Sequence, residues 1–128
     1  MAWLLDTVAL VSWWGQPDYL GRLARDVLED EDNEIFLSAV SVWEIANKNR
    51  IGKLPQFDGF ATRFPEMLRE STFRLLDVTA EHAMRGGFLP GAHRDPFDRL
   101  LAGQALSEDM TMLTNDPQIA AFGCKVLW

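Results

Sequence analysis

Two carboxylates, two guanidinium groups and an imidazole lie within the stretch from His93 to Arg99, directly before an apolar run with helical spacing. Asp95 followed by Pro96 is typical of a helix start, because a carboxylate accepts from the free amide groups there and proline suits the first turn. Asp98 then falls at the third helical position, where a capping box also places an acid. The two aspartates can therefore cap a helix or hold a metal ion, and the other acids of the chain bear on that choice.

Three more acids lie beside predicted strands. Asp6 ends the apolar run 2–5. Glu44 opens the helix predicted after the run 35–37, and Asp116 follows a third such run. Short apolar runs of this kind predict buried parallel strands, whose carboxyl ends meet at one edge of the sheet. We therefore expect these three acids at one edge.

Asp98 is expected at the same edge, because a helix antiparallel to the strand it feeds begins at that strand's carboxyl end. An acid at a helix start is stabilised by the helix dipole and by free amides, so each of the four also has a capping interpretation. Carboxylates that share a site cannot all stay ionised without a raised pKa or a counter-cation. Mg²⁺ or Mn²⁺ meets that requirement, since both take carboxylate and phosphate oxygens. The chemistry that this favours is metal-assisted hydrolysis of a phosphodiester.

Strand-like runs alternate with helical stretches along the chain. This pattern predicts an α/β fold with a mainly parallel central sheet and helices on both faces. At 128 residues the chain suits one domain of ordinary size, so we expect a single domain over residues 1–128. The expected strands are 2–5, 35–37, 73–78, 111–113 and 125–128. Helices are expected over 8–14, over 18–28, over 57–70 with an interruption at Pro65, from Thr79 to Gly86-Gly87, and for a short stretch from Pro117. Another expected helix has a capping box at Ser41 and Glu44 and ends near Gly52, and in the helix expected from Pro96 the residue Gly103 permits close packing.

The formal net charge of −7 argues against a broad basic surface for nucleic acid, so any such contact must be local or helped by bound cations. Cys124 is the one cysteine, which excludes an intramolecular disulfide and favours a reducing cytoplasm. We expect it to be a core thiol rather than a nucleophile. The N-terminus lacks the basic region of a signal peptide, and no apolar run approaches the roughly 20 residues of a membrane span. We therefore expect no membrane contact.

Other site chemistries lack their sequence patterns. His82 and His93 do not have the spacing of a zinc site, and no cysteine pair accompanies them. Gly86-Gly87 is not followed by the lysine and serine or threonine of a phosphate-binding loop. Trp13-Trp14 beside Pro17 is a candidate hydrophobic partner surface.

Together these residues resemble the PIN-domain ribonucleases of the VapC toxin type over nearly the whole length of the chain. Each motif alone is weak, whereas all of them in this order form a specific pattern. The resemblance implies a PIN-like three-layer fold. In chain order the motifs are Leu4-Leu5-Asp6-Thr7, Ser41-Val42-Trp43-Glu44-Ile45 with Lys48, Gly52-Lys53-Leu54, Leu89-Pro90, His93 through Arg99, Gln104-Ala105 and Leu113-Thr114-Asn115-Asp116.

The resemblance implies endonucleolytic cleavage of RNA that depends on Mg²⁺ or Mn²⁺ and leaves 3′-hydroxyl and 5′-phosphate ends. It also implies a VapB-type antitoxin that wraps the toxin and plugs the site, and a homodimer. The family's acidic quartet then carries over to four residues, of which Asp6, Asp98 and Asp116 hold the ion directly or through water. The fourth, Glu44, positions or deprotonates the attacking water. The supporting residues are Asp95, Thr7 and Thr114, and the candidate RNA-binding residues are Lys48, Arg50, Lys53, Arg94 and Arg99.

Two other functions are alternatives. A haloacid-dehalogenase-like phosphatase also carries an aspartate after its first strand, but it needs a second aspartate two residues later, where this chain has Val8. An RNA- or protein-binding module would keep the fold without cutting, and the complete acidic quartet counts against it.

Overall fold

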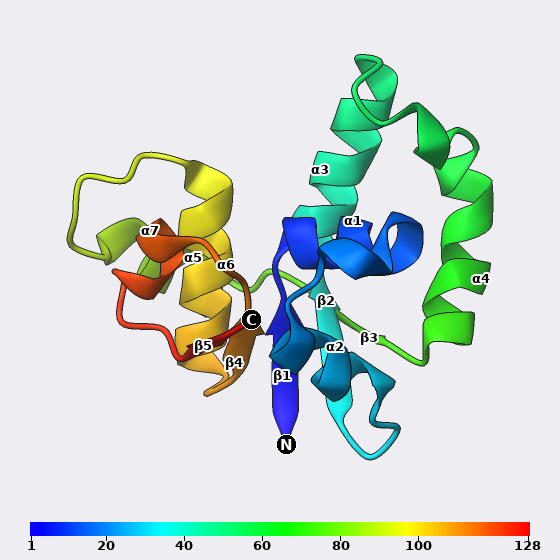
Figure 1. Cartoon of the computed structure of the whole chain (residues 1–128). Coiled ribbons are helices and arrows are strands. Elements are labelled where there is room, and N and C mark those ends of the chain that lie inside the picture. Colours follow the sequence, from blue (N-terminus) through cyan, green and yellow to red (C-terminus); the bar gives the residue numbers. More distant parts are fainter.

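Five strands form one fully parallel sheet at the centre of the molecule (Figure 1). The computed structural model describes all residues from Met1 to Trp128. The strands are β1 (Ala2–Leu5), β2 (Glu34–Ser38), β3 (Arg74–Leu76), β4 (Thr111–Leu113) and β5 (Val126–Leu127). Their order across the sheet is β3-β2-β1-β4-β5. The strand order reverses at β1, and the crevice at the carboxyl ends of β1 and β4 is where open α/β sheets bind ligands.

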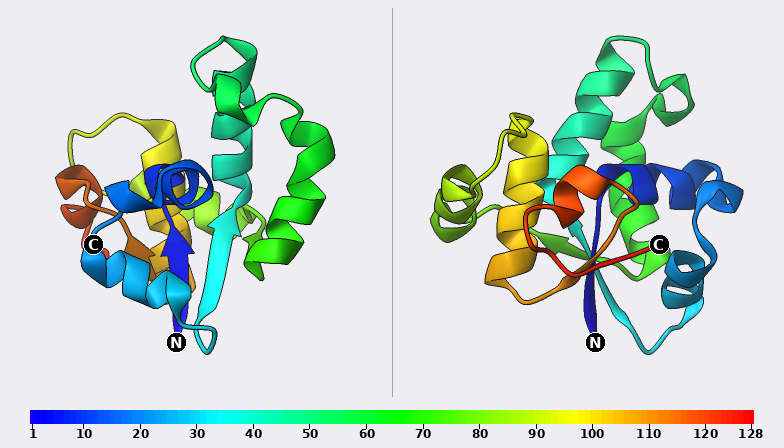
Figure 2. Two further views of the ribbon diagram at one scale, coloured as in Figure 1. Left: turned by 45° about the vertical axis from the view of Figure 1, so that its right-hand side comes forward. Right: turned by 60° about the vertical axis from the view of Figure 1, so that its left-hand side comes forward.

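Helices cover both faces of the sheet, so the expected three-layer α/β fold is confirmed (Figure 1, Figure 2). The α-helices are α1 (Thr7–Gly15), α2 (Arg22–Glu29), α3 (Ala39–Arg50), α4 (Phe60–Ser71), α5 (Ala80–Phe88), α6 (Pro96–Ser107) and α7 (Pro117–Ala120), and the 3₁₀ helices are η1 (Pro17–Tyr19) and η2 (Pro55–Phe57). No helix combines the length and the apolar character that crossing a bilayer requires.

Two apolar cores lie on the two faces of the sheet, and β1 contributes to both. Leu5 belongs to the core built with α1, α2 and α4, whereas Leu4 belongs to the core built with α6. Both side chains are fully buried. Because successive side chains of a strand point to opposite faces, a continuous apolar run is what a strand between two helical layers requires.

The start of α3 differs from the prediction. Its N-cap is Ser38, whose hydroxyl accepts from the Val40 amide at 3.0 Å. The predicted capping box at Ser41 and Glu44 was therefore wrong, because both residues lie inside the helix, where their side chains are free to reach α1. The predicted end is confirmed: Gly52 follows the last turn with a φ of 82°, the left-handed conformation that glycine adopts most easily.

Two further helices depart from the expected boundaries. α2 begins at Arg22 rather than at residue 18, because Gly21 is extended (ψ 156°) and separates it from the preceding 3₁₀ turn. α4 runs through Pro65 without interruption. The missing N–H of Pro65 leaves the Ala61 carbonyl without its helical partner, and Ala61 is exposed, so water can serve that carbonyl.

The two adjacent tryptophans of α1 pack partly within the chain, and their role as a partner surface stays a prediction. Trp13 and Trp14 are half-buried and pack against the core that includes α4. The Trp14 indole donates from Nε1 to Ser71 Oγ at 2.8 Å, and its ring lies 6.4 Å from that of Phe64. An amphipathic indole serves a core boundary as well as an interface, so only the exposed part of this pair is left for a partner.

Close packing of α5 and α6 depends on two glycines. A Cβ atom on Gly103 of α6 would collide with the His82 carbonyl oxygen and the Gly86 amide of α5. A Cβ atom on Gly86 would in turn collide with the Arg99 carbonyl oxygen of α6. The prediction that Gly103 permits close packing is therefore confirmed.

We predict that Gly103→Ala destabilises the protein by about 1–3 kcal/mol, because the backbones of α5 and α6 must move apart. The matched control is Gly87→Ala on α5, where an added Cβ meets nothing within 4 Å. That variant should gain up to about 1 kcal/mol, since alanine favours helix more than glycine does. Urea unfolding measures both. Equal effects of the two substitutions would contradict the packing argument.

Candidate functional site

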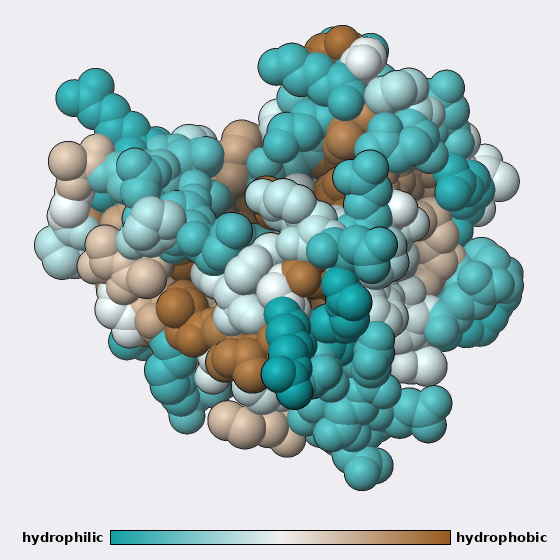
Figure 3. Space-filling view, viewed as in Figure 1, coloured by the Kyte–Doolittle hydropathy of each residue, from teal (hydrophilic) through white to brown (hydrophobic).

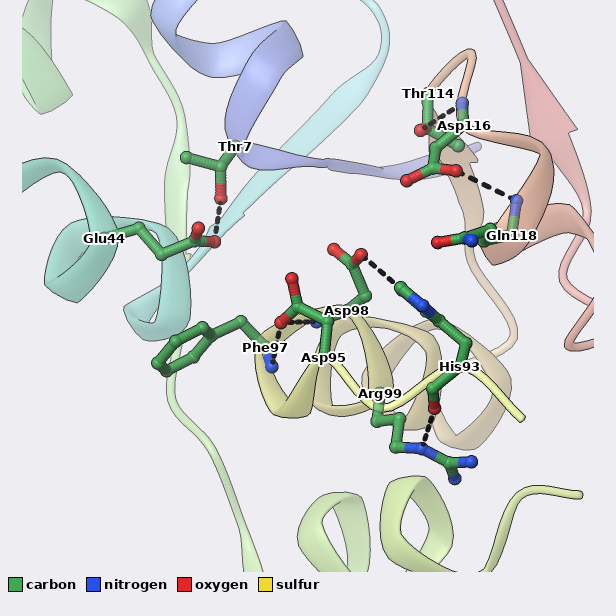
Figure 4. A network of polar contacts seen from close by, with 10 residues as sticks. All are labelled: Thr7, Glu44, His93, Asp95, Phe97, Asp98, Arg99, Thr114, Asp116 and Gln118. Atoms are coloured by element: carbon green, nitrogen blue, oxygen red, sulfur yellow. Dashed lines mark hydrogen bonds and ion pairs between the residues drawn. The ribbon is translucent and has the colours of Figure 1, made fainter. Parts of the chain in front are cut away.

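A pocket of about 380 Å³ lies at the carboxyl ends of β1 and β4. It brings together all four acids of the predicted quartet, together with Asp95 and Thr7. Figure 4 shows Thr7, Glu44, Asp95, Asp98 and Asp116 around this pocket. Figure 3 shows that the surface is hollowed between the start of α6 and α3, with hydrophilic residues on both flanks. The lining residues are Asp6, Thr7, Val8, Tyr19, Glu44, Lys48, Asp95, Asp98, Asn115, Asp116 and Pro117.

Asp6 is the most buried acid of the pocket, with 5% of its surface exposed. It is the N-cap of α1, and its Oδ1 accepts from the Ala9 amide at 2.7 Å. Burial raises the pKa of Asp6 to about 6, although hydrogen bonds from the Thr114 side chain and the Ala9 amide oppose the rise. Asp98 and Asp116 line the same pocket, and their charges raise the pKa of Asp6 further.

Glu44 is held by a chain of hydroxyl groups. The Thr7 hydroxyl donates to Glu44 Oε1 at 2.6 Å, and Ser41 Oγ lies 2.8 Å from Thr7 Oγ1. Thr7 has one hydroxyl hydrogen and gives it to the carboxylate, so Ser41 is the donor to Thr7. Burial raises the pKa of Glu44, and the bond from Thr7 and the charge of Lys48, 3.8 Å from Oε2, oppose that rise.

Capping and pocket contacts are divided between the two aspartates at the start of α6. Asp95 is the N-cap, and its Oδ1 accepts from the amides of Phe97 at 2.9 Å and Asp98 at 3.4 Å. The Asp98 side chain takes no part in the cap, and its Oδ2 lies 2.8 Å from His93 Nε2. Burial raises the pKa of Asp98, and the hydrogen bond with His93 opposes the rise. Figure 4 shows this pair facing the other acids.

Asp116 reaches the pocket as the N-cap of α7. Its Oδ1 accepts from the Gln118 amide at 2.9 Å, and its own amide donates to Thr114 Oγ1 at 3.1 Å. Thr114 is buried, with 2% of its surface exposed, so its hydroxyl is fixed between Asp6 and the start of α7. Both predicted supporting threonines thus lie where they orient carboxylates.

The donor set of the pocket fits a divalent metal ion. Its side chains offer mainly carboxylate oxygens, and Lys48 is the one cation that lines it. Ligand atoms of His93, Asp95 and Asp98 lie within 4.8 Å of one another, which is close enough for a shared ion. Hard divalent cations prefer such oxygen ligands and offset the mutual repulsion of the carboxylates.

Sequence reasoning did not assign three residues that contact the site. The sequence places His93 in the motif before α6 but does not identify it as the partner of Asp98, and the pattern at Ser41 predicts a helix cap rather than the observed contact with Thr7. Tyr19 lines the pocket from η1, and nothing in its local sequence indicated this. Only His93 had a usable signal, since it precedes the helix that carries Asp98.

The five predicted RNA-binding cations occupy different environments. Lys48 lines the pocket, and Arg50 is exposed and donates to Asn47 Oδ1. Lys53 and Arg94 are exposed. Arg99 instead points back into the loop before α6, where it donates to four backbone carbonyls and lies 5.2 Å from the Phe122 ring centre. The carbonyls belong to Gly86, Leu89, Gly91 and His93.

The remaining reactive side chains lie outside the pocket. Cys124 is buried against α6, and burial raises the pKa of its thiol, as expected for a core residue. His82 is 1% exposed and accepts at Nδ1 from the Thr79 amide in the cap of α5. Its Nε2 lies 2.8 Å from Glu108 Oε1, so its ring joins α5 to the end of α6.

The comparison with known proteins agrees with this parallel sheet and its carboxylate-lined pocket. The PIN domain family matches residues 3–123, so the chain belongs to the PIN-domain family. The resemblance seen in the sequence is thereby confirmed. PIN-domain nucleases generally use a divalent metal ion, in keeping with the donor set of the pocket.

One curated relative is Ribonuclease VapC16 of Mycobacterium tuberculosis. It is 40% identical to this chain over 58 residues, which make up 45% of this chain and 41% of the relative. The matched segment therefore spans less than half of that protein's length.

Three solved structures share the fold across almost the whole chain. VapBC2 from Rickettsia felis, bound to a DNA fragment from its promoter, has a TM-score of 0.75 at 19% identity and covers 99% of this chain and 98% of its own. VapBC-1 from nontypeable Haemophilus influenzae has a TM-score of 0.70 at 17% identity, covering 99% and 97%. VapC20 from Mycobacterium tuberculosis, a Sarcin-Ricin loop cleaving toxin, has a TM-score of 0.68 at 16% identity, covering 95% of each chain.

We predict that Arg99→Ala lowers the free energy of unfolding by about 2 kcal/mol, because several charge-assisted hydrogen bonds to the loop are lost. The exposed neighbour Arg94 is the control, and Arg94→Ala should change stability by less than about 0.5 kcal/mol. Urea unfolding at neutral pH separates the two. Equal stability of both variants would show that the Arg99 contacts to the loop are not stabilising.

We also predict that the metal-free chain loses stability as the pH rises from 4 to 7. The pKa of Asp6 is about 6 in the folded chain against 3.8 without burial, so the folded state holds its proton more tightly. Protonated Asp6 therefore adds about 3 kcal/mol to the free energy of unfolding. This contribution is fully present below pH 3.8 and is lost as the pH rises past 6. Thermal or urea unfolding in a chelator measures this loss.

Asp6→Asn is the control for this pH dependence, because asparagine caps a helix as well as aspartate and does not titrate. The variant should lose less stability than the wild type between pH 4 and 7. An identical pH dependence in both proteins would contradict the buried charge of Asp6 as the cause.

Proposed function

We propose that the chain is the toxin endoribonuclease of a type II toxin-antitoxin system, acting as a single PIN domain over residues 1–128. The observation that carries this proposal is the convergence of Asp6, Glu44, Asp98 and Asp116 in one pocket of a PIN domain. Burial raises the pKa of three of these acids, so the site favours a bound cation at neutral pH. The name of the curated relative, a ribonuclease, and the description of VapC20 as a Sarcin-Ricin loop cleaving toxin support the same activity.

The cofactor in this proposal is Mg²⁺ or Mn²⁺, held by Asp6, Asp98 and Asp116 directly or through water. Mg²⁺ typically uses one or two carboxylates, keeps several waters and binds phosphate oxygens, and Mn²⁺ accepts the same ligands. When bound, the ion supplies polarisation of the phosphate, a lower pKa of the attacking water and charge neutralisation at the leaving oxygen.

The residues of the chain then orient the reactants. Thr7 fixes Oε1 of Glu44, so Oε2 is left to accept a proton from the attacking water. The water oxygen forms a bond to phosphorus as the bond from phosphorus to O3′ breaks. The leaving O3′ takes a proton from solvent, and the products carry a 3′-hydroxyl and a 5′-phosphate. In this proposal Lys48, whose Nζ lies 3.8 Å from Glu44 Oε2, contacts a phosphate oxygen of the RNA.

The partners in this proposal are an RNA substrate, a VapB-type antitoxin that plugs the pocket, and a second copy of the chain in a homodimer. The solved VapBC complexes that share the fold motivate the antitoxin. The proposed location is the cytoplasm, where RNA is found and where a chain with one cysteine keeps a free thiol.

The test compares two neighbouring aspartates at the start of α6. Asp98→Asn should lower RNA cleavage in Mg²⁺ or Mn²⁺ by at least about 100-fold with an unchanged melting temperature, because a metal ligand is lost. Asp95→Asn should retain most of the cleavage, because asparagine also caps a helix. Calorimetric titration with Mn²⁺ gives a second measurement, in which Asp98→Asn should lose much more affinity than Asp95→Asn.

Cleavage that persists in a chelator, or full activity of Asp98→Asn, would overturn the metal mechanism. Binding of RNA without any cleavage would indicate a binding module. Release of phosphate from small monoesters such as p-nitrophenyl phosphate would indicate a phosphatase.

A further inference from the structure

A second pocket of about 510 Å³ adjoins the acidic pocket along α1. Its lining residues are Val11, Ser12, Gly15, Gln16, Tyr19 and Gln56. Tyr19 also lines the acidic pocket, so the two cavities share one wall. Val8 lines the acidic pocket. Ser12 and Gly15 follow Val8 by four and seven residues, so all three lie on one face of α1. The two cavities therefore lie next to each other, and we call the one lined by these six residues the neutral groove.

The Tyr19 ring is exposed yet held in place. Its exposed fraction is 58%. The ring makes a T-shaped contact with the ring of Trp128, with 6.1 Å between the ring centres and 73° between the planes. The η1 turn fixes its backbone, since the Tyr19 amide donates to the Gln16 carbonyl at 3.0 Å. More than half of this positioned ring is exposed, so Tyr19 offers a preformed aromatic surface for stacking at the boundary of the acidic pocket.

The polar side chains of the neutral groove suit an uncharged ligand. No acidic or basic side chain lines it, in contrast to the neighbouring pocket. Gln16 and Gln56 form hydrogen bonds within the protein through backbone atoms. The backbone N–H of Gln16 donates to the Ser12 carbonyl, and the backbone carbonyl of Gln56 accepts from the Arg63 side chain. Their side-chain amides are left to offer a donor and an acceptor each, which matches the edge of a nucleobase.

The charge of the chain gives a reason for such a groove. With a formal net charge of −7, the protein repels an RNA backbone, and Lys48 is the one cation of the acidic pocket. Base stacking and base-edge hydrogen bonds do not depend on that charge. A groove that takes up a base would hold the strand next to the carboxylates without a basic surface.

We propose that the neutral groove binds an unpaired nucleobase of the RNA strand, adjacent to the phosphate in the acidic pocket, with the Tyr19 ring as the stacking surface. This inference rests on the proposed ribonuclease function and identifies the part of the substrate that the chain recognises. Gln16 and Gln56 contact the base edge, and they set which base is preferred.

The test measures RNA binding apart from cleavage. The probes are fluorescein-labelled RNA strands of a single base type, about ten nucleotides long, and an abasic ribose-phosphate strand of the same length. Fluorescence anisotropy is recorded in Ca²⁺, another oxygen-binding divalent ion. The full-length wild type should bind the base-bearing strands more tightly than the abasic strand. Tyr19→Ala should weaken binding of the base-bearing strands by about tenfold and leave the abasic strand unaffected.

Two variants control for other effects. Tyr19→Phe keeps the ring and should bind within about twofold of the wild type, as expected for stacking. Phe88→Ala removes a ring on α5 that is 83% exposed and lies outside both pockets, and it should change nothing. Gln56→Ala should alter the order of affinity among the four base types, which a purely structural role of Gln56 would leave unchanged.

The outcomes separate this inference from the proposed function. If the wild type cuts RNA but Tyr19→Ala binds all strands as the wild type does, or weakens the abasic strand equally, the neutral groove is not a base site. The same holds if Tyr19→Ala impairs only binding of an antitoxin peptide, which would make the groove a protein interface. If the wild type neither binds nor cuts RNA, the proposed function itself fails, and the base site falls with it.

Discussion

The structure depends on placing mutually repelling carboxylates at one edge of a parallel sheet. Helix starts make this possible, because the free amides there stabilise negative charge. Asp6 caps α1 and Asp116 caps α7, each with a single carboxylate oxygen. Asp95 caps α6 and leaves Asp98 free of that role. The choice between capping and chemistry that the sequence posed is therefore not exclusive, since an aspartate can give one oxygen to the helix and turn the other toward the pocket.

The same constraint explains the buried hydroxyl groups around the pocket. A buried carboxylate needs donors, and a basic side chain in that position would compete with a bound cation. Thr7 donates to Glu44, Ser41 donates to Thr7, and the Thr114 side chain bonds to Asp6. Neutral donors of this kind hold the carboxylates in place without cancelling their charge. The pKa of Asp6 stays raised despite them because burial is the larger effect.

The sequence predicted the features that depend on local signals. The strand before Asp6, the cap at Asp95 and the glycine end of α3 each follow from a few adjacent residues, and the sheet edge follows from strand and helix alternation. Contacts between distant residues were not predictable in this way. Ser41 meets Thr7 across 34 residues of sequence, and the helix cap predicted at Ser41 lies at Ser38 instead. A tryptophan pair likewise carries no local sign of whether it faces solvent or α4.

Arg99 shows how a residue outside the pocket supports it. Its guanidinium donates to the His93 carbonyl at 2.6 Å, and the His93 ring lies 2.8 Å from Asp98 Oδ2. The loop before α6 is therefore fixed from one side by Arg99 while it fixes Asp98 on the other. The packing of Gly86 against the Arg99 carbonyl sets how closely α5 approaches α6. In this charged motif Arg99 therefore has a structural role. It holds the backbone at His93 in place, and His93 in turn holds the half-buried carboxylate of Asp98 in position.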